Sequence, residues 1–223
     1  MTRQRIIAAL FCALLLGAVS ALAGTIDTEF LQRPWPNQRV REIEVGRQQV
    51  RWREYASKSE GLFAGVGFTV PRERQTVWKL ANDYHDVGTM TPGVTAVRVI
   101  QESPTRQVIQ VDVKVLWKSL RLNFEIEQDP PQAVRFRLIN EAFGEYRGVC
   151  SFEEAPQTMG KGGVQHANTS VDLATWFKPS RPVPMRLLLI VERIAMLRGA
   201  KEFLRACEEK SSAHSTHPSS SLH

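Results

Sequence analysis

One long apolar helix near the C-terminus constrains the fold of this chain most. Met185 to Cys207 reads MRLLLIVERIAMLRGAKEFLRAC, which at 1.5 Å per residue makes a helix of roughly 34 Å, long enough to cross a small domain. One side of this helix is apolar and must be buried. The residues on that side are Leu189, Met196, Ala200, Phe203, Leu204 and Cys207.

The chain before this helix consists mainly of segments in which apolar and polar residues alternate. Such alternation over neighbouring segments predicts an antiparallel meander with one solvated face. Arg72–Asn82 and Asp83–Thr91 are predicted as two short helices after the first strand, ending at Pro92-Gly93. The fold class is therefore α+β, with a curved sheet of about seven strands around the C-terminal helix. The predicted strands are Leu62–Val70, Val94–Ile100, Gln107–Trp117, Leu120–Glu127, Val134–Ile139, Tyr146–Phe152 and Val164–Phe177.

Residues 24–61 are predicted as an N-terminal extension that contains a hairpin. Val40–Val45 and Val50–Tyr55 alternate apolar and charged residues, and Gly46 lies near the turn between them. This hairpin either extends one edge of the sheet or caps a cavity, and the sequence does not decide between the two.

The first 23 residues have the pattern of an export signal. Arg3 and Arg5 precede the apolar run Ile6–Leu16, and Ala21 and Ala23 form a small-x-small cleavage site. We expect cleavage after Ala23 and export to the bacterial periplasm. The alternative is an uncleaved N-terminal membrane anchor.

The net charge of the chain and its distribution limit the classes of partner that it could bind. Removing the two arginines of the signal lowers the formal net charge from +6 to +4, and this charge is spread along the sequence. A dense basic run of the nucleic-acid-binding kind is absent, whereas weak positive charge favours transient contact with an anionic membrane surface. The oligomeric state is left open. Cys150 and Cys207 fall on apolar faces and are expected to be buried thiols, with a disulfide between them as the alternative in an exported protein. Residues 210–223 are predicted to be a disordered Ser/His-rich tail.

Several short motifs carry a resemblance to a known family. Phe68-Thr69-Val70-Pro71 leads into Val77-Trp78-Lys79-Leu80, followed by Asp83 and Met90-Thr91-Pro92-Gly93-Val94, and a Gly162-Gly163 turn precedes the last strand. With the order of strand, two short helices, meander and long helix, this resembles the START-like (SRPBCC) superfamily, in particular its polyketide cyclase/dehydrase and coenzyme-Q-binding branch. The resemblance covers roughly Leu62 to Cys207, so residues 62–209 are assigned as the START-like ligand-binding domain.

The resemblance implies a helix-grip fold with a hydrophobic cavity between the concave face of the sheet and the long helix. Its mouth would lie near Met90, Pro92 and Gly93, and its ligands would be lipids, quinones, polyketides or similar apolar molecules. The superfamily has no universal catalytic motif, so the resemblance implies no catalytic residue, cofactor or metal. The predicted cavity residues are Val111, Val113, Val115, Leu122, Phe124, Phe136, Leu138, Tyr146, Cys150, Thr169, Val171, Leu189, Met196 and Phe203.

Few polar groups lie on the predicted inward register. Tyr146 either hydrogen-bonds a ligand oxygen or packs as a ring. Glu192 either serves the cavity as an inward polar group, pairs with Arg193 or lies in solvent. The sequence contains no GxSxG elbow, and neither cysteine that follows the signal has a nearby His or Asn.

Three functions are compatible with these observations. The first is a carrier or binder of a hydrophobic small molecule or lipid. The second is a cyclase, aromatase or dehydratase, and the third is an interaction module with a solid core that recognises a partner through Trp35 and Trp52. Direct packing of the helix on the sheet would explain the same apolar pattern without a cavity.

Overall fold

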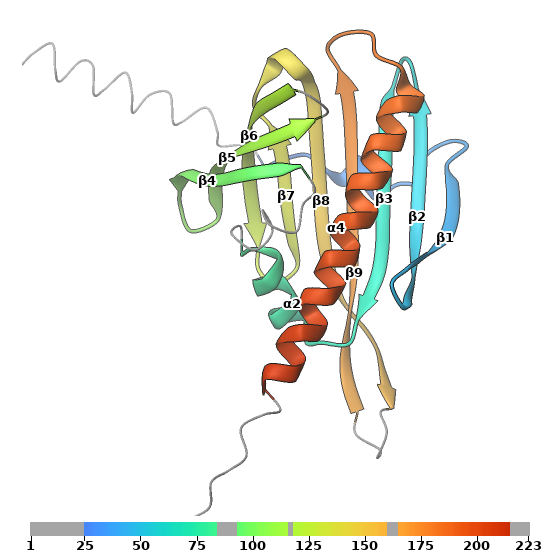
Figure 1. Ribbon diagram of the computed structural model, residues 1–223, viewed down its shortest axis with the longest axis vertical. Coiled ribbons are helices and arrows are strands. Elements are labelled where there is room, and N and C mark those ends of the chain that lie inside the picture. The colour runs from blue at the N-terminus through green and yellow to red at the C-terminus, as the bar shows by residue number, and fades with distance from the viewer. Residues whose placement is uncertain (1–24, 84–92, 116–117, 160–164, 215–223) are drawn as a thin grey trace, which may run out of the picture.

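A computed structural model describes residues 25–83, 93–115, 118–159 and 165–214 (Figure 1). Three predicted features lie outside the described residues. They are the signal peptide, the second short helix with Pro92 after it (residues 84–92), and the Gly162-Gly163 turn. Within the described part, none of the helices combines the length and apolar character needed to cross a membrane.

The nine strands of the described residues form one antiparallel sheet in the order β1-β2-β3-β9-β8-β7-β6-β5-β4. The predicted α+β fold is confirmed, with nine strands in place of about seven, because the N-terminal hairpin β1–β2 pairs with β3 and extends the sheet. The hairpin therefore has the first of its two predicted roles. The strands are β1 (Arg39–Val45), β2 (Gln48–Ser57), β3 (Gly61–Val70), β4 (Val94–Glu102), β5 (Arg106–Val115), β6 (Lys118–Asp129), β7 (Ala133–Leu138), β8 (Gly144–Met159) and β9 (Gln165–Pro179).

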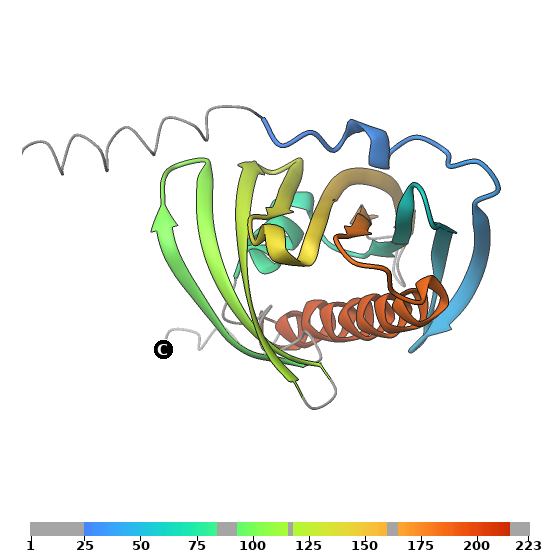
Figure 2. The same ribbon diagram turned by 90° about the horizontal axis from the view of Figure 1, so that it is seen from above.

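The helix α4 (Met185–His214) lies along the concave face of the sheet (Figures 1 and 2). It packs most closely against β3, with further contacts to β1, β2 and the short helix α2 (Arg74–Ala81). Its buried side carries Met196, Ala200, Leu204 and Cys207, as the helical spacing predicted. The helix continues to His214, so residues 210–214 are helical where a disordered tail was predicted, and residues 215–223 lie outside the described residues.

Alternation along β3 places its apolar residues on the concave face. Leu62, Ala64 and Val66 are almost fully buried there, and burying each large aliphatic side chain contributes roughly 1.5–3 kcal/mol. On the opposite face, Gly65 makes room for Arg53, because a Cβ at position 65 would lie 3.0 Å from Arg53 Nη2. This space lets Arg53 cross β3 and pair with Asp172 on β9.

The N-terminal segment covers the convex face of the sheet. Leu31, at the end of the 3-10 helix η2 (Glu29–Leu31), is fully buried in a second, smaller core with Phe63. Trp35 stacks on Tyr55, with ring centroids 5.3 Å apart, and Trp52 is fully buried on the concave side. These two tryptophans therefore pack within the protein, which argues against the interaction module that relied on them.

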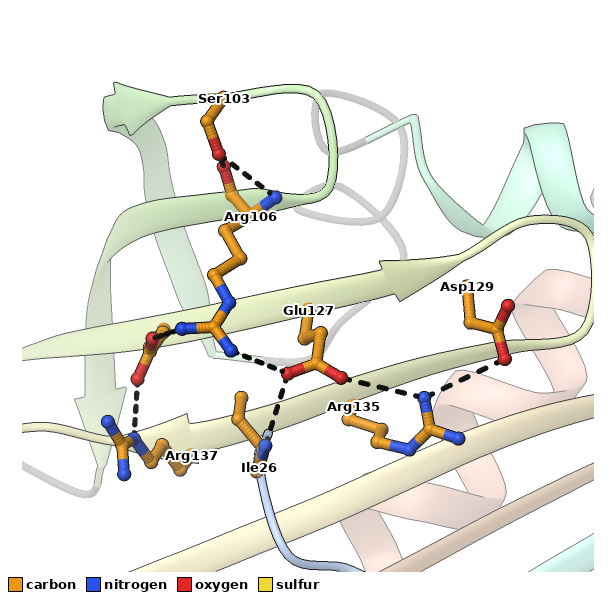
Figure 3. A network of polar contacts seen from close by, with 8 residues as sticks. Ile26, Ser103, Arg106, Glu127, Asp129, Arg135 and Arg137 are labelled. Carbon is orange, nitrogen blue, oxygen red and sulfur yellow. Dashed lines mark hydrogen bonds and ion pairs between the residues drawn. The ribbon is translucent and has the colours of Figure 1, made fainter. Parts of the chain in front are cut away.

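A network of charged residues fixes the start of this segment to the convex face (Figure 3). Glu127 pairs with Arg106 at 3.2 Å and with Arg135 at 3.8 Å, and its Oε2 also accepts a hydrogen bond of 3.1 Å from the main-chain nitrogen of Ile26. The side chain of Ile26 is buried. The convex face is thus a structural surface, and the concave face remains as the candidate site.

Candidate functional site

The predicted cavity residues fall into two groups. Thr169, Val171 and Met196 are buried in the solid core where α4 packs on β3 and β9. The hydroxyl of Thr169 donates a 2.7 Å hydrogen bond to the carbonyl of Arg72, which gives this residue a structural role. The structure therefore does not place these three with the remaining residues of the predicted set.

The second group keeps accessible surface although its members lie on the inward register. On β5 to β7 the inward residues belong to the register pairs Val111–Leu122 and Phe124–Leu138. The side chain of Val115 lies outside the described residues. The partly accessible members are Val111, Val113, Leu122, Phe124, Phe136, Leu138, Tyr146, Cys150, Leu189 and Phe203.

Three polar side chains on this face are deep inside the protein and still partly accessible. Tyr146 and Cys150 on β8 and Glu192 on α4 are densely surrounded by protein atoms, and burial is the largest cause of the pKa shift of each. Burial raises the pKa of the Cys150 thiol to about 12. All three nevertheless keep accessible surface. From this combination we infer a hollow between the sheet and α4.

Aromatic rings form one wall of this hollow. Tyr146 lies 6.0 Å from Phe124, 6.1 Å from Phe136 and 5.9 Å from Phe177, measured between ring centroids. Phe136 lies over Gly148 on the neighbouring strand, where any Cβ would overlap its ring. Phe177 was not in the predicted set, although it follows the same alternation on β9 as Thr169 and Val171.

A polar cluster connects α4 to the sheet beside this wall. Glu192 Oε1 accepts a hydrogen bond of 3.0 Å from the Tyr146 hydroxyl and another of 2.8 Å from the Thr175 hydroxyl. Glu192 therefore neither pairs with Arg193 nor lies in solvent, so these two alternatives are wrong, and its side chain faces the sheet as the remaining alternative requires. Thr175 on β9 was missed, although its position on the inward register was a signal for it.

The environment of this cluster favours its neutral forms. Burial raises the pKa of Glu192, and the hydrogen bonds from Thr175 and Tyr146 only partly oppose this effect. Burial and the neighbouring Glu192 raise the pKa of Tyr146 well above its ordinary value. A carboxyl group that keeps its proton can act as a hydrogen-bond donor.

Arg193 points away from Glu192 and toward β2. Its guanidinium hydrogen-bonds the carboxylate of Glu54 and lies 5.8 Å from the centroid of the Trp52 ring. Trp52 Nε1 donates a 2.7 Å hydrogen bond to the same carboxylate. Burial opposes the ionisation of Glu54, but these hydrogen bonds and the charges of Arg193 and Arg41 outweigh it, so the pKa of Glu54 is lowered.

A pocket of about 670 Å³ reaches Leu138 and Tyr146 where β7 ends and β8 begins. Gly93, the described member of the predicted mouth, has φ +85° and directly precedes β4. Antiparallel pairing places the start of β4, the end of β7 and the start of β8 toward the same end of the sheet.

Among the described side chains, no group of three or more His, Cys, Asp or Glu is arranged to hold a metal ion.

The sequence matches the model of a known protein family. The family described as polyketide cyclase/dehydrase and lipid transport matches residues 70–204. This range runs from the end of β3 through most of α4 and includes Tyr146, Thr175 and Glu192. No curated protein matches this sequence.

Solved structures share the fold. An aromatase/cyclase, Zhui, from a Streptomyces species has a TM-score of 0.56 at 15% identity and covers 67% of this chain and 94% of its own. A protein from Thermus thermophilus has a TM-score of 0.51 at 21% identity, with coverages of 69% and 99%. A START superfamily protein from Mycobacterium smegmatis has a TM-score of 0.53 at 12% identity, with coverages of 66% and 97%.

Proposed function

Because this chain belongs to the polyketide cyclase/dehydrase and lipid transport family and has a START-like helix-grip fold, we propose that it binds a hydrophobic small molecule or lipid in the hollow between the sheet and α4. The observation that carries the proposal is the accessible surface of Tyr146, Cys150 and Glu192 at depth. A fatty acyl, isoprenoid, quinone or polyketide-like ligand would fill this space. Each buried CH₂ of such a ligand contributes roughly 0.8 kcal/mol.

A binding or carrier function explains the side chains of the hollow better than covalent catalysis does. With a pKa of about 12, the Cys150 thiol is protonated at neutral pH and is a poor nucleophile. The second candidate is a cyclase or dehydratase, which Glu192 favours as a carboxyl group of raised pKa in an apolar setting. Turnover of a polyketide-like substrate that stops in Glu192→Gln would support this second candidate.

Export to the periplasm and transient membrane contact are part of the proposal. The signal-like N-terminus supports export, and the outer face of α4 supports membrane contact. Leu187, Ile190, Val191 and Ile194 recur at helical spacing on that face and are between 44% and 55% exposed. Exposed cations lie at both ends of this apolar strip, which suits an anionic lipid surface. They are Arg186, Arg198 and Lys201.

A bulky substitution inside the hollow tests the binding function. Val113→Trp on the concave side of β5 should block uptake of diphenylhexatriene, a hydrocarbon whose fluorescence rises in apolar surroundings, by on the order of tenfold. Lys114→Trp is the matched control, because Lys114 is the next residue of the same strand and is exposed. Wild-type uptake in both variants, or no uptake by the wild-type protein, would contradict the proposal.

A further inference from the structure

We propose that Glu192 donates a hydrogen bond from its Oε2 to the oxygen of an uncharged, carbonyl-bearing ligand, such as an apolar ketone, ester or quinone, with Tyr146 and Thr175 as positioning residues. This inference rests on the proposed binding function and adds the chemical class of the ligand. It also gives the orientation of the bound ligand: its hydrocarbon part lies along the aromatic wall, and its carbonyl oxygen points at α4.

The first argument is that, within the described residues, the hydrogen bonds to Glu192 reach only one of its two carboxyl oxygens. Glu192 Oε1 accepts hydrogen bonds from both the Tyr146 and the Thr175 hydroxyl groups, at 3.0 and 2.8 Å. Among the described residues, no hydrogen bond or ion pair reaches Oε2, and this atom is not one of the enclosed, unpartnered polar atoms of that part of the chain. Oε2 therefore keeps accessible surface and can meet a ligand oxygen.

The second argument is where the proton of a neutral carboxyl group would lie. Burial favours the protonated form of Glu192. Because both lone pairs of Oε1 accept hydrogen bonds from the two hydroxyl groups, the proton belongs on Oε2. An O–H group that faces an apolar hollow requires an acceptor, and a carbonyl oxygen of a ligand supplies one.

The third argument is the charge around the site. From β8, Tyr146 and Cys150 face the hollow as neutral groups, and the concave side of β3 is apolar. Arg193 on α4 and Arg41 on β1 are both directed to Glu54 on β2. The short helix α2 turns Val77 and Leu80 toward the core. Within the described residues, no cation faces Glu192, so a ligand carboxylate would lose its hydration without gaining a counter-ion.

Two probes with the same skeleton test this inference. Heptanophenone and heptylbenzene differ by one ketone oxygen, and calorimetric titration gives the affinity of each. Because the ketone also loses hydration on binding, the readout is how the ketone-to-hydrocarbon affinity ratio changes between variants. Glu192→Leu should lower this ratio by about tenfold, the size expected for losing one buried hydrogen bond. Glu192→Gln should preserve it, since its amide can accept through Oε1 and donate through Nε2.

Infrared spectroscopy at a series of pH values distinguishes a Glu192 that hydrogen-bonds the ligand from one that only supports the fold. The stretching frequency of a ¹³C-labelled ketone should be lower in the wild-type protein and in Glu192→Gln than in Glu192→Leu. In the wild-type protein this lowering should disappear as rising pH ionises Glu192, whereas Glu192→Gln should show no such dependence. This comparison stands even if Glu192→Leu fails to fold.

The outcomes separate the inference from the function on which it rests. If heptylbenzene binds but neither the affinity ratio nor the ketone frequency depends on residue 192 or on pH, the inference is wrong and the binding function stands. If neither probe binds the wild-type protein, both are wrong.

Discussion

Glu54, which binds Arg193 of α4 from β2, and Glu192, the residue of α4 before Arg193, have opposite pKa shifts. Glu54 accepts hydrogen bonds from Arg193 and Trp52, which lower its pKa despite burial. Glu192 is the residue next to Arg193, but it faces two hydroxyl groups, so burial dominates and its pKa is raised. The partner of each carboxyl group therefore decides its charge.

The pKa of Glu192 predicts how stability depends on pH. Between the ordinary value of 4.5 and the raised value, the folded protein binds more protons than the unfolded chain. The free energy of unfolding should therefore fall as pH rises through this window, relative to Glu192→Gln. Urea unfolding of both proteins at a series of pH values measures the difference. Parallel pH profiles would show that Glu192 ionises as readily in the folded protein as in the unfolded chain.

The ion pair between Glu54 and Arg193 should matter for stability as a unit. The Glu54 side chain is only 2% exposed and that of Arg193 is 32% exposed. Arg193→Leu leaves the buried carboxylate with the Trp52 hydrogen bond and only the longer ion pair to Arg41, at 3.9 Å, and should cost roughly 3 kcal/mol, the low end for breaking a buried pair. In a double-mutant cycle with Glu54→Leu, the second substitution should recover part of that loss. Strictly additive losses would contradict this coupling.

At the scale of elements, α4 has two different outward faces along its length. Its first half carries the apolar strip of Leu187, Ile190, Val191 and Ile194, and its second half exposes charged residues. The opposite side of the helix packs on β3. Packing therefore explains the buried side of α4 and leaves the apolar strip for the proposed membrane contact.

Replacing apolar residues of the strip by negatively charged ones tests the proposed membrane contact. Ile190→Glu combined with Ile194→Glu should reduce co-sedimentation with vesicles rich in phosphatidylglycerol by on the order of tenfold, because both apolar insertion and charge attraction are lost. Val40→Glu is the control, since Val40 is 56% exposed on β1, outside the strip. Equal losses in both proteins, or wild-type binding by the double variant, would argue against contact through α4.

Much of this architecture follows from local sequence patterns. Alternation placed Phe124, Phe136 and Leu138 on the inward side, and helical spacing identified the buried side of α4, because both depend on neighbours a few residues apart. The addition of β1–β2 to the sheet was not predictable, since a hairpin with one apolar face satisfies either arrangement. The partners of Glu192 depend on how α4 is rotated against β8 and β9, which are distant in sequence, so periodicity could not reveal them.

At the scale of the whole molecule, the concave face of the sheet has two regions that differ in how closely they are packed. On the side of β3 and β9, α4 packs directly and residues such as Val66 and Val171 are buried. Toward β5 to β8, inward residues such as Val113 and Phe124 keep accessible surface. The curvature of the sheet around α4 separates these regions (Figure 2). The account depends on the second region being hollow.

Crystals pressurised with xenon test this central claim most directly, because xenon occupies apolar cavities large enough to admit it. We expect xenon density between the aromatic wall of Phe124, Phe136 and Tyr146 and the first half of α4. Density confined to the protein's own side chains in that region, with no xenon bound, would show that the interior is solid and would contradict the binding function proposed here.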